Sequence, residues 1–391
     1  MNLMACPLSL RTLRRHPPSF VLALMLTAGC ADGGATSGAA SGGSAEVPPF
    51  ELEHVLTVSG HVADFVSIDA VIADQDGRMY VADSDALQIA VVDAEGRRTG
   101  AIGRPGAGPG EFRRLLDIAW AGDLLLALDW PQGSALFHRD GRIAATGEFR
   151  GRAGSLAFSG PDVGYARAVI PGSGVEYGLI APTGSYSVLP MLSDSVPVTS
   201  PVTSVDCGTS DGWVHGLLLP FARRGPMRAF LPGGVLAVAH RDAYRIDLID
   251  IESGDTIRSI TRDYPRIPLT RERWEGQDVI RQYRELVSER GSAFLQSDPS
   301  QPCPLDERPE FLPVLLAVVA DEAGRLWVES STEDGFAVTV FDANHEPVGQ
   351  APMPVRDETV APYVRANRLY IVTRDEFDVQ SIEVYEARLL E

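Results

Sequence analysis

A short phrase of alternating apolar and polar residues recurs along the chain from residue 50 onward. Each copy has an apolar stretch, a turn that contains glycine, and a run in which Leu, Tyr or Trp alternates with Val or Ala. The copies are residues 74–83, 121–129, 232–240, 321–329 and 365–372, with a weaker one at 164–169. Alternation with a period of two residues, bounded by Asp and Gly, predicts antiparallel strands joined by tight turns.

After the clear copies comes a further strand that ends in an Asp turn, as at 88–96, 135–141, 245–250 and 337–342. Each unit therefore predicts a four-stranded antiparallel sheet, which is one blade of a β-propeller. Neighbouring turns lie 45, 42 and 43 residues apart where the repeat is plain, and 70 and 90 residues apart in the middle of the chain.

The longest interval is explained by residues 264–310, which lack strand patterning. Apolar residues at helical spacing between 270 and 290 predict a helix there; they are Val279, Ile280, Tyr283, Leu286 and Val287. We predict an all-β fold with six blades of four antiparallel strands and a helical insertion after blade four. Seven blades are the alternative, with residues 187–216 as the extra one.

Residues 51–58 also alternate, but they precede the first full blade. An open ring would leave sheet edges unpaired. The N-terminal strand is therefore predicted to complete the last blade, which ends near residues 381–385, and so to close the ring.

Residues 1–29 are predicted to be an export signal. Three arginines and no acid precede an apolar run at 20–29 that is too short to span a bilayer but suits a secretory signal. The sequence at 26–30, Leu-Thr-Ala-Gly-Cys, resembles a bacterial lipobox, which makes Cys30 the acylated N-terminus of the mature protein. An ordinary signal peptide cut near Ala28 or Ala31 is the alternative.

The Gly-, Ser- and Ala-rich residues 30–49 have too little apolar bulk to form a core and are expected to be a flexible tether. Residues 50–391 would form the propeller. The protein is expected to lie outside the cytoplasm. The lipid would anchor it to a membrane, on the side that faces the periplasm or the cell surface.

Residues 104–112 (RPGAGPGEF) resemble the linker that precedes an NHL repeat, and Val81-Ala82-Asp83 resembles the repeat itself. The similarity covers residues 66–145 and, more loosely, 311–388. With the lipobox, the chain resembles bacterial secreted six-bladed propellers of the NHL-repeat-like group. That group includes ligand-binding and scaffold proteins and also enzymes such as amidating lyases and lactonases, so the resemblance alone does not decide the function.

The chain has 391 residues with a net charge of −19, and 45% of its residues are hydrophobic. These are ordinary values for a folded protein and exclude disorder over the whole chain. The acidic balance excludes nucleic acid as the main partner, because phosphate binding needs clustered basic residues.

Cys207 and Cys303 are the cysteines that remain once the signal is removed and Cys30 is acylated. In an oxidising compartment we expect them to form a disulfide, with two separate thiols as the alternative. None of the seven histidines has HxH or HxxxH spacing. We therefore predict no metal site and no cofactor, although a funnel Ca or Zn ion would accompany the enzyme alternative given below.

Two aspartates, Asp69 and Asp117, directly precede the predicted inner strands of blades one and two, and Arg228 takes the matching place in blade four. Inner strands surround the axis of a propeller, so the three side chains are predicted to face the central funnel. They could bind a polar ligand or a cation there, or they could only cap loops and pair with neighbours.

The sequence favours a binding or interaction module whose small-molecule or protein ligand is unknown. The competing hypothesis is a metal-dependent hydrolase or lyase with its site in the funnel. A structural scaffold of the cell envelope is a third.

Overall fold

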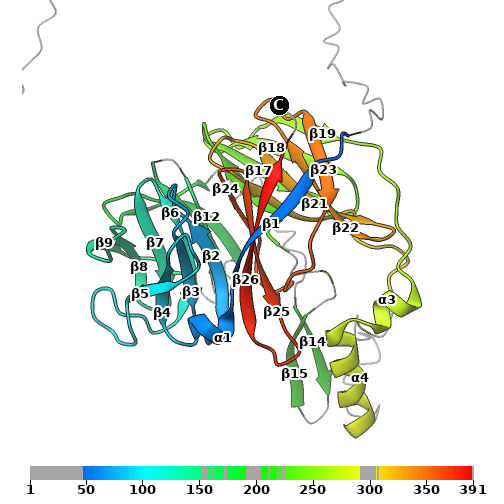
Figure 1. The fold of residues 1–391 in the computed structure, drawn as a ribbon, viewed down its shortest axis with the longest axis horizontal. Helices are drawn as coiled ribbons and strands as arrows, with labels where there is room; N and C mark the ends of the chain where they lie inside the picture. The colour runs from blue at the N-terminus through cyan, green and yellow to red at the C-terminus, as the bar shows by residue number, and fades with distance from the viewer. Residues whose placement is uncertain are drawn as a thin grey trace, which may run out of the picture. The chain divides into compact units, whose positions relative to one another are not determined.

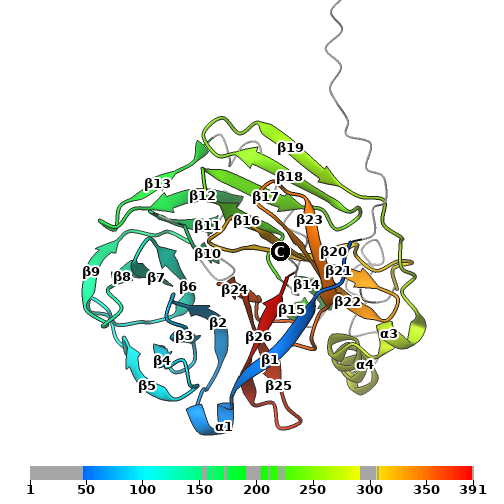
Figure 2. The same ribbon diagram turned by 45° about the horizontal axis from the view of Figure 1, so that its top comes forward.

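The computed structural model describes residues 47–151, 156–160, 162–170, 174–190, 204–209, 212–218, 221, 225–290, 305 and 308–389. Within these residues, six four-stranded antiparallel sheets are arranged as blades around a ring (Figures 1 and 2). The predicted six-bladed propeller is confirmed.

The first three blades follow one another in sequence, and in each the strands pair in chain order from the inner to the outer edge. Their strands are β2 (Ile68–Ala73), β3 (Met79–Asp83), β4 (Gln88–Val92) and β5 (Arg98–Ile102) in blade one; β6 (Leu115–Ala121), β7 (Leu124–Asp129), β8 (Gly133–Phe137) and β9 (Ile143–Gly147) in blade two; and β10 (Leu156–Phe158), β11 (Gly164–Ile170), β12 (Gly174–Ile180) and β13 (Tyr186–Val188) in blade three.

The remaining blades repeat this order, except that the outer strand of blade six comes from the N-terminal side of the chain. Their strands are β16 (Arg228–Leu231), β17 (Val235–Ala239), β18 (Arg245–Asp250) and β19 (Thr256–Thr261) in blade four; β20 (Leu315–Ala320), β21 (Leu326–Thr332), β22 (Gly335–Phe341) and β23 (Pro347–Pro352) in blade five; and β24 (Tyr363–Arg365), β25 (Arg368–Arg374), β26 (Gln380–Arg388) and β1 (Glu51–Val58) in blade six.

Aspartate turns explain why the repeat is visible in the sequence. Asp74 accepts hydrogen bonds on Oδ1 from the backbone N–H groups of Asp76 and Arg78, each at 3.0 Å, and Gly77 has a φ of +80°. A left-handed residue at this position favours glycine. The same bonds recur at Asp93, Asp321, Asp342 and Asp375.

The glycine-rich segment 104–112 is held together by one carboxylate. Glu111 accepts backbone hydrogen bonds from Ala107 and Gly108 at 3.0 and 2.8 Å, and it accepts another from Arg104 Nε at 2.9 Å. A Cβ at Gly106 would lie 2.1 Å from Glu111 Oε2, so the close approach requires glycine. The motif that carries the family resemblance thus has a local structural role here.

The hydrophobic core lies between the blades. Six clusters of buried side chains each join two neighbouring blades and together complete the ring. Between blades one and two, for example, the rings of Tyr80 and Trp120 meet edge to face with their centroids 5.3 Å apart. Burial on both faces accounts for the continuous apolar runs in the inner and second strands.

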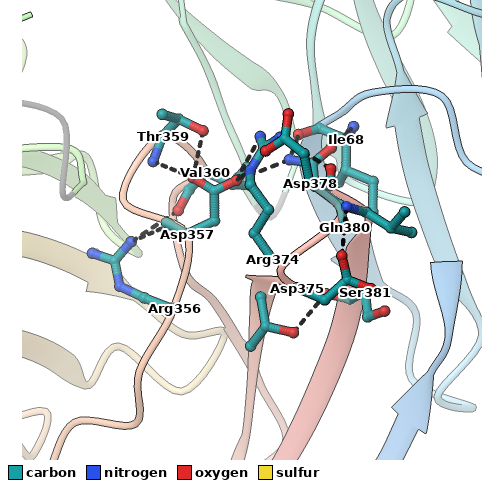
Figure 3. A network of polar contacts seen from close by, with 12 residues as sticks. Ile68, Arg356, Asp357, Thr359, Val360, Arg374, Asp375, Asp378, Gln380 and Ser381 are labelled. Atoms are coloured by element: carbon teal, nitrogen blue, oxygen red, sulfur yellow. Dashed lines mark hydrogen bonds and ion pairs between the residues drawn. The ribbon is translucent and has the colours of Figure 1, made fainter. Parts of the chain in front are cut away.

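The ring is closed as predicted, because β1 pairs antiparallel with β26 from Glu51 opposite Arg388 to Val58 opposite Ile382. Side chains reinforce the join between blades six and one (Figure 3). Gln380 accepts from the backbone N–H of Ile68 at 2.6 Å and donates to Asp357 Oδ2 at 3.0 Å. Asp357 also accepts from Arg374 at 2.8 Å, and all three of these polar side chains belong to blade six or the segment before it.

The predicted helical insertion is confirmed as two helices, α3 (Arg271–Glu275) and α4 (Asp278–Arg290), after blade four. They lie at the periphery of the ring in both views (Figures 1 and 2). Trp274, Ile280 and Tyr283 are buried in a cluster with Leu316 of blade five. The short helix α1 (Gly60–Ala63), between β1 and β2, was not expected.

The seven-blade alternative is wrong. Within residues 187–216, the described residues contribute the end of β13 and most of a two-stranded hairpin, β14 (Ser204–Thr209) with β15 (Gly212–Leu218). A hairpin of two strands lacks the four strands that a blade requires.

Several sequence predictions fall on residues that are not described. These are the export signal at 1–29, Cys30 and the tether up to residue 46, and Cys303; Cys207 lies on β14, but its side chain is likewise outside the description. Of the helices in the described ranges, none is long and apolar enough to span a membrane.

Candidate functional site

A cavity of about 850 Å³ lies at the centre of the ring and is lined by the inner strands of all six blades. Those strands are β2, β6, β10, β16, β20 and β24. Because the blades repeat around one axis, their inner strands run in the same direction along it. We call the end at which these strands begin the entry end, and the end at which they finish the exit end.

The wall between the two ends is mainly apolar. It includes Val71, Ile118, Phe158, Val318 and Val364. Ligand sites commonly combine such a wall with a few polar groups that fix orientation. In this cavity the charged side chains lie towards the two ends.

Asp117 lies at the entry end, where its two carboxylate oxygens accept backbone hydrogen bonds. Oδ1 accepts from Ile118 N and Oδ2 from Ala157 N, both at 2.8 Å. Burial raises the pKa of Asp117 from 3.8 to about 7, and the nearby carboxylate of Asp69 adds to the rise, although the two hydrogen bonds oppose it. The side chain can therefore exchange a proton near neutral pH.

The three predicted site residues all line this cavity, but they do not occupy matching positions. The pairing of β2 with β3 skips a residue between Ile68 and Ala70, which makes Asp69 the extra residue of a bulge. In blade two the bulge falls at Leu116, so Asp117 corresponds to Ala70. The alignment of the two aspartates is therefore wrong by one residue.

Arg228 corresponds to yet another position. It is the first residue of β16, and the preceding residue, Met227, accepts a backbone hydrogen bond from Ala239. In blades one and two, the residue just before the inner strand also accepts a backbone hydrogen bond of this kind. Arg228 therefore corresponds to Ile68 in blade one and to Leu115 in blade two. The three charged residues thus come from three successive positions of the repeat and still face one cavity.

Arg228 is only 7% exposed, and its Cζ lies 5.8 Å from the centre of the Tyr177 ring. Tyr177 is buried and is the cross-strand partner of Arg167, which also lines the cavity. Burial lowers the pKa of Arg167, and the positive charge of Arg228 lowers it further, although Tyr177 opposes this. Two guanidinium groups therefore lie close together at the entry end.

A third arginine, Arg241, lines the cavity from the segment after β17. Its Nη1 donates to the carbonyl oxygen of Phe221 at 2.9 Å, and burial lowers its pKa to about 10, so it stays charged at neutral pH. Arg167 and Arg241 were not predicted from the sequence as cavity residues, because neither lies on an inner strand. The only signal is a charged residue inside the apolar run 164–170.

The acids at the exit end are engaged by the protein itself. Asp123 pairs with Arg139 at 3.1 Å, and Asp321 pairs with Arg325 at 2.7 Å. Glu322 accepts from the backbone N–H of Ala366 at 2.9 Å. These contacts hold turns between strands, which favours a structural role.

In the part of the chain that the structure describes, no group of three or more His, Cys, Asp or Glu side chains is placed to hold a metal ion. His240, one of the histidines in the repeats, instead contacts Asp247 at 2.8 Å.

No protein-family model matches the chain, and no curated protein matches it. Among solved structures, a candidate exported protein of Bacteroides fragilis is 10% identical, with a TM-score of 0.42 over 88% of this chain and 95% of that one. The PQQ-bound aldose sugar dehydrogenase of Streptomyces coelicolor is 14% identical, with a TM-score of 0.39 over 88% and 100%. Regucalcin, a calcium-binding protein of Agrobacterium tumefaciens, is 13% identical, with a TM-score of 0.37 over 87% and 95%. The blade count rests on the strand pairing described above.

Proposed function

We propose that the chain is an exported, lipid-anchored propeller of the NHL-repeat-like group that acts as a ligand-binding module. Its ligand would enter the central cavity, with Asp69, Asp117 and Arg228 at the entry end as binding residues. The proposal of export and lipid anchoring is based on residues 1–30, in which an apolar run ends in small residues and Cys30.

One observation carries the proposal of binding. The cavity of about 850 Å³ is within the range of small-molecule sites, and its charged side chains come from separate blades that converge only at the axis. Burying charged side chains is costly, and arginines are seldom buried in a packed core, so three arginines at one end of the cavity favour a binding role. A partner protein that inserts a side chain into the cavity would use the same groups.

The metal-dependent hydrolase or lyase is retained as a second candidate because of Asp117. A carboxylate whose pKa is raised to about 7 is suited to general acid–base catalysis at neutral pH. Elemental analysis of the purified protein separates the two candidates, since stoichiometric Ca or Zn would favour the enzyme.

The binding site can be tested by thermal-shift screening of small polar metabolites against the exported protein. Asp69→Asn and Asp117→Asn should change the affinity for any hit, because both carboxylates line the cavity. Asp76→Asn is the matched control, since Asp76 is exposed on a turn and does not line the cavity. Equal affinities in all three variants would place the site elsewhere.

A further inference from the structure

Charges at the entry end are separated by sign. Asp69 and Asp117 come from blades one and two, whereas Arg167, Arg228 and Arg241 come from blades three and four. The whole chain carries a net charge of −19, so its outer surface repels anions in general. A local group of arginines inside the ring is therefore a distinct feature of this molecule.

The arginines are positioned before any ligand arrives. Tyr177 supports both of the closest ones, since it is the cross-strand partner of Arg167 and lies under the guanidinium of Arg228. Arg241 is fixed separately by its hydrogen bond to the carbonyl of Phe221. Side chains that are held in this way lose little conformational entropy on binding.

Burial is the main cause of the lowered pKa of Arg167, and the positive charge of the neighbouring Arg228 lowers it further. An anion near both guanidinium groups would offset the repulsion between them, and it would receive charge-assisted hydrogen bonds that are stronger than neutral ones. Carboxylate and phosphate groups match the planar donor fork of arginine. Beyond the arginines, the wall is apolar and suits a hydrocarbon or aromatic body.

We propose that the entry end of the cavity binds the acidic headgroup of a small molecule, and that the apolar body of this molecule lies along the apolar wall of the cavity. Arg167 and Arg228 would contact the headgroup, which is a carboxylate or a phosphate, and Arg241 would add a third positive charge. This inference rests on the proposed function, because it assigns a ligand class to the same cavity.

The direction of the pH dependence distinguishes an anionic from a cationic ligand. The charged groups that line this end are Asp69 on β2, Asp117 on β6, Arg167 on β11, Arg228 on β16 and Arg241 after β17. Asp117, whose pKa burial raises to about 7, changes charge near neutral pH. A headgroup anion should bind more weakly as pH rises from 6 to 8, because Asp117 becomes negative, whereas a cation should bind more tightly.

The experiment uses two fluorescent probes that share one apolar body. The anionic probe is 8-anilinonaphthalene-1-sulfonate, and the neutral one is N-phenyl-1-naphthylamine. Arg228→Gln and Arg167→Gln should each lower the affinity for the anionic probe about tenfold or more and leave the neutral probe within about twofold. Arg150→Gln, with a side chain that is 84% exposed, is the control and should change neither.

Thermal denaturation shows whether each variant is folded. If Arg228→Gln is not folded, Arg167→Gln alone decides the test. Displacement of the anionic probe by 1-naphthoate or by 1-naphthyl phosphate identifies the preferred headgroup. If the neutral probe binds while the arginine variants bind the anion as well as the wild type does, the ligand class is wrong and the proposed function stands. If neither probe binds, both proposals fail.

Discussion

Asp117 shows at the scale of a single residue how backbone contacts and burial oppose each other. Its two hydrogen bonds stabilise the carboxylate, but burial has the larger effect and raises its pKa to about 7, with a smaller contribution from the neighbouring Asp69. Between pH 4 and 7 the folded protein therefore holds a proton that the unfolded chain has already released. The contribution of Asp117 to stability therefore falls as pH rises through this window and is level above it.

Asp117→Asn removes this dependence. The free energy of unfolding of the wild type, minus that of the variant, should fall by about 1–3 kcal/mol between pH 4.5 and pH 8. The figure lies below the full linkage value because the side chain is partly open to the cavity. Urea denaturation at both pH values measures it, and an equal difference at the two values would contradict the raised pKa.

Gly103 gives a second prediction at the residue scale. Its φ is +77°, and a Cβ would lie 2.2 Å from Cε2 of the fully buried Phe112. Gly103→Ala should lower the free energy of unfolding by about 2–4 kcal/mol through strain and overpacking. Gly100→Ala is the control, because no heavy atom lies within 4 Å of its Cβ position. Comparable urea midpoints for the two variants would count against this account.

The limits of sequence reasoning also appear at this scale. Asp69 and Asp117 each precede an apolar run, and nothing in the sequence marks the bulges that put them one position out of register. Arg167 and Tyr177 are brought together by strand pairing, which the weak repeat of blade three did not define. That residues of the inner strands line the central cavity was predictable from the repeat, whereas Arg167 and Arg241 were not, and the relative positions of the charged groups depend on backbone irregularities.

At the scale of the element, the aspartate turn made the blades recognisable. A side chain that binds the backbone two and four residues ahead, with a left-handed residue between, leaves a local signature that needs no tertiary contact. Where the left-handed residue is His345 or Asp378 instead of glycine, the bonds persist and only the sequence signal weakens. The hairpin β14–β15 has no comparable signature, so its two strands were not predicted as such.

Helix α4 was predictable because its apolar residues recur at helical spacing, and the structure confirms that Ile280 and Tyr283 are buried. Arg281→Pro should cost about 3 kcal/mol locally by removing a helix hydrogen bond and clashing with the preceding turn. Circular dichroism should show reduced helix signal with the β signal retained, and Arg281→Ala should change neither. Loss of all β signal would mean that α4 is part of the core fold.

At the scale of the whole molecule, stability depends on closure. Blade six shares one hydrophobic cluster with blade one and another with blade five. Loss of its outer strand would therefore weaken the packing against both neighbouring blades. A chain that starts at residue 60 lacks β1 and exposes the edge of β26. It should form larger oligomers or aggregates than a chain that starts at residue 47 and keeps β1. Light scattering coupled to gel filtration measures both, and a monomeric, equally stable truncated chain would contradict the closing role of β1.

The proposed membrane localisation is also a property of the whole molecule. If Cys30 carries the lipid, Cys30→Ser should move the protein from the membrane fraction to the soluble fraction, because no other part of the proposed signal supplies a stable anchor. Fractionation followed by immunoblotting checks this. Membrane association that survives the substitution would contradict lipid attachment at Cys30.

Closure by β1 also brings the two ends of the domain together. A Cβ at Gly349 would lie 2.8 Å from Phe50 and 3.4 Å from Leu389, so the residues just before β1 and just after β26 share one patch of core. A short peptide could connect them, and the chain could then be opened at a surface turn of another blade. In such circular permutants all four strands of blade six would be continuous in sequence, and a different blade would be built from both ends of the chain. The blade at which the ring closes would then depend on where the chain begins and not on the fold itself.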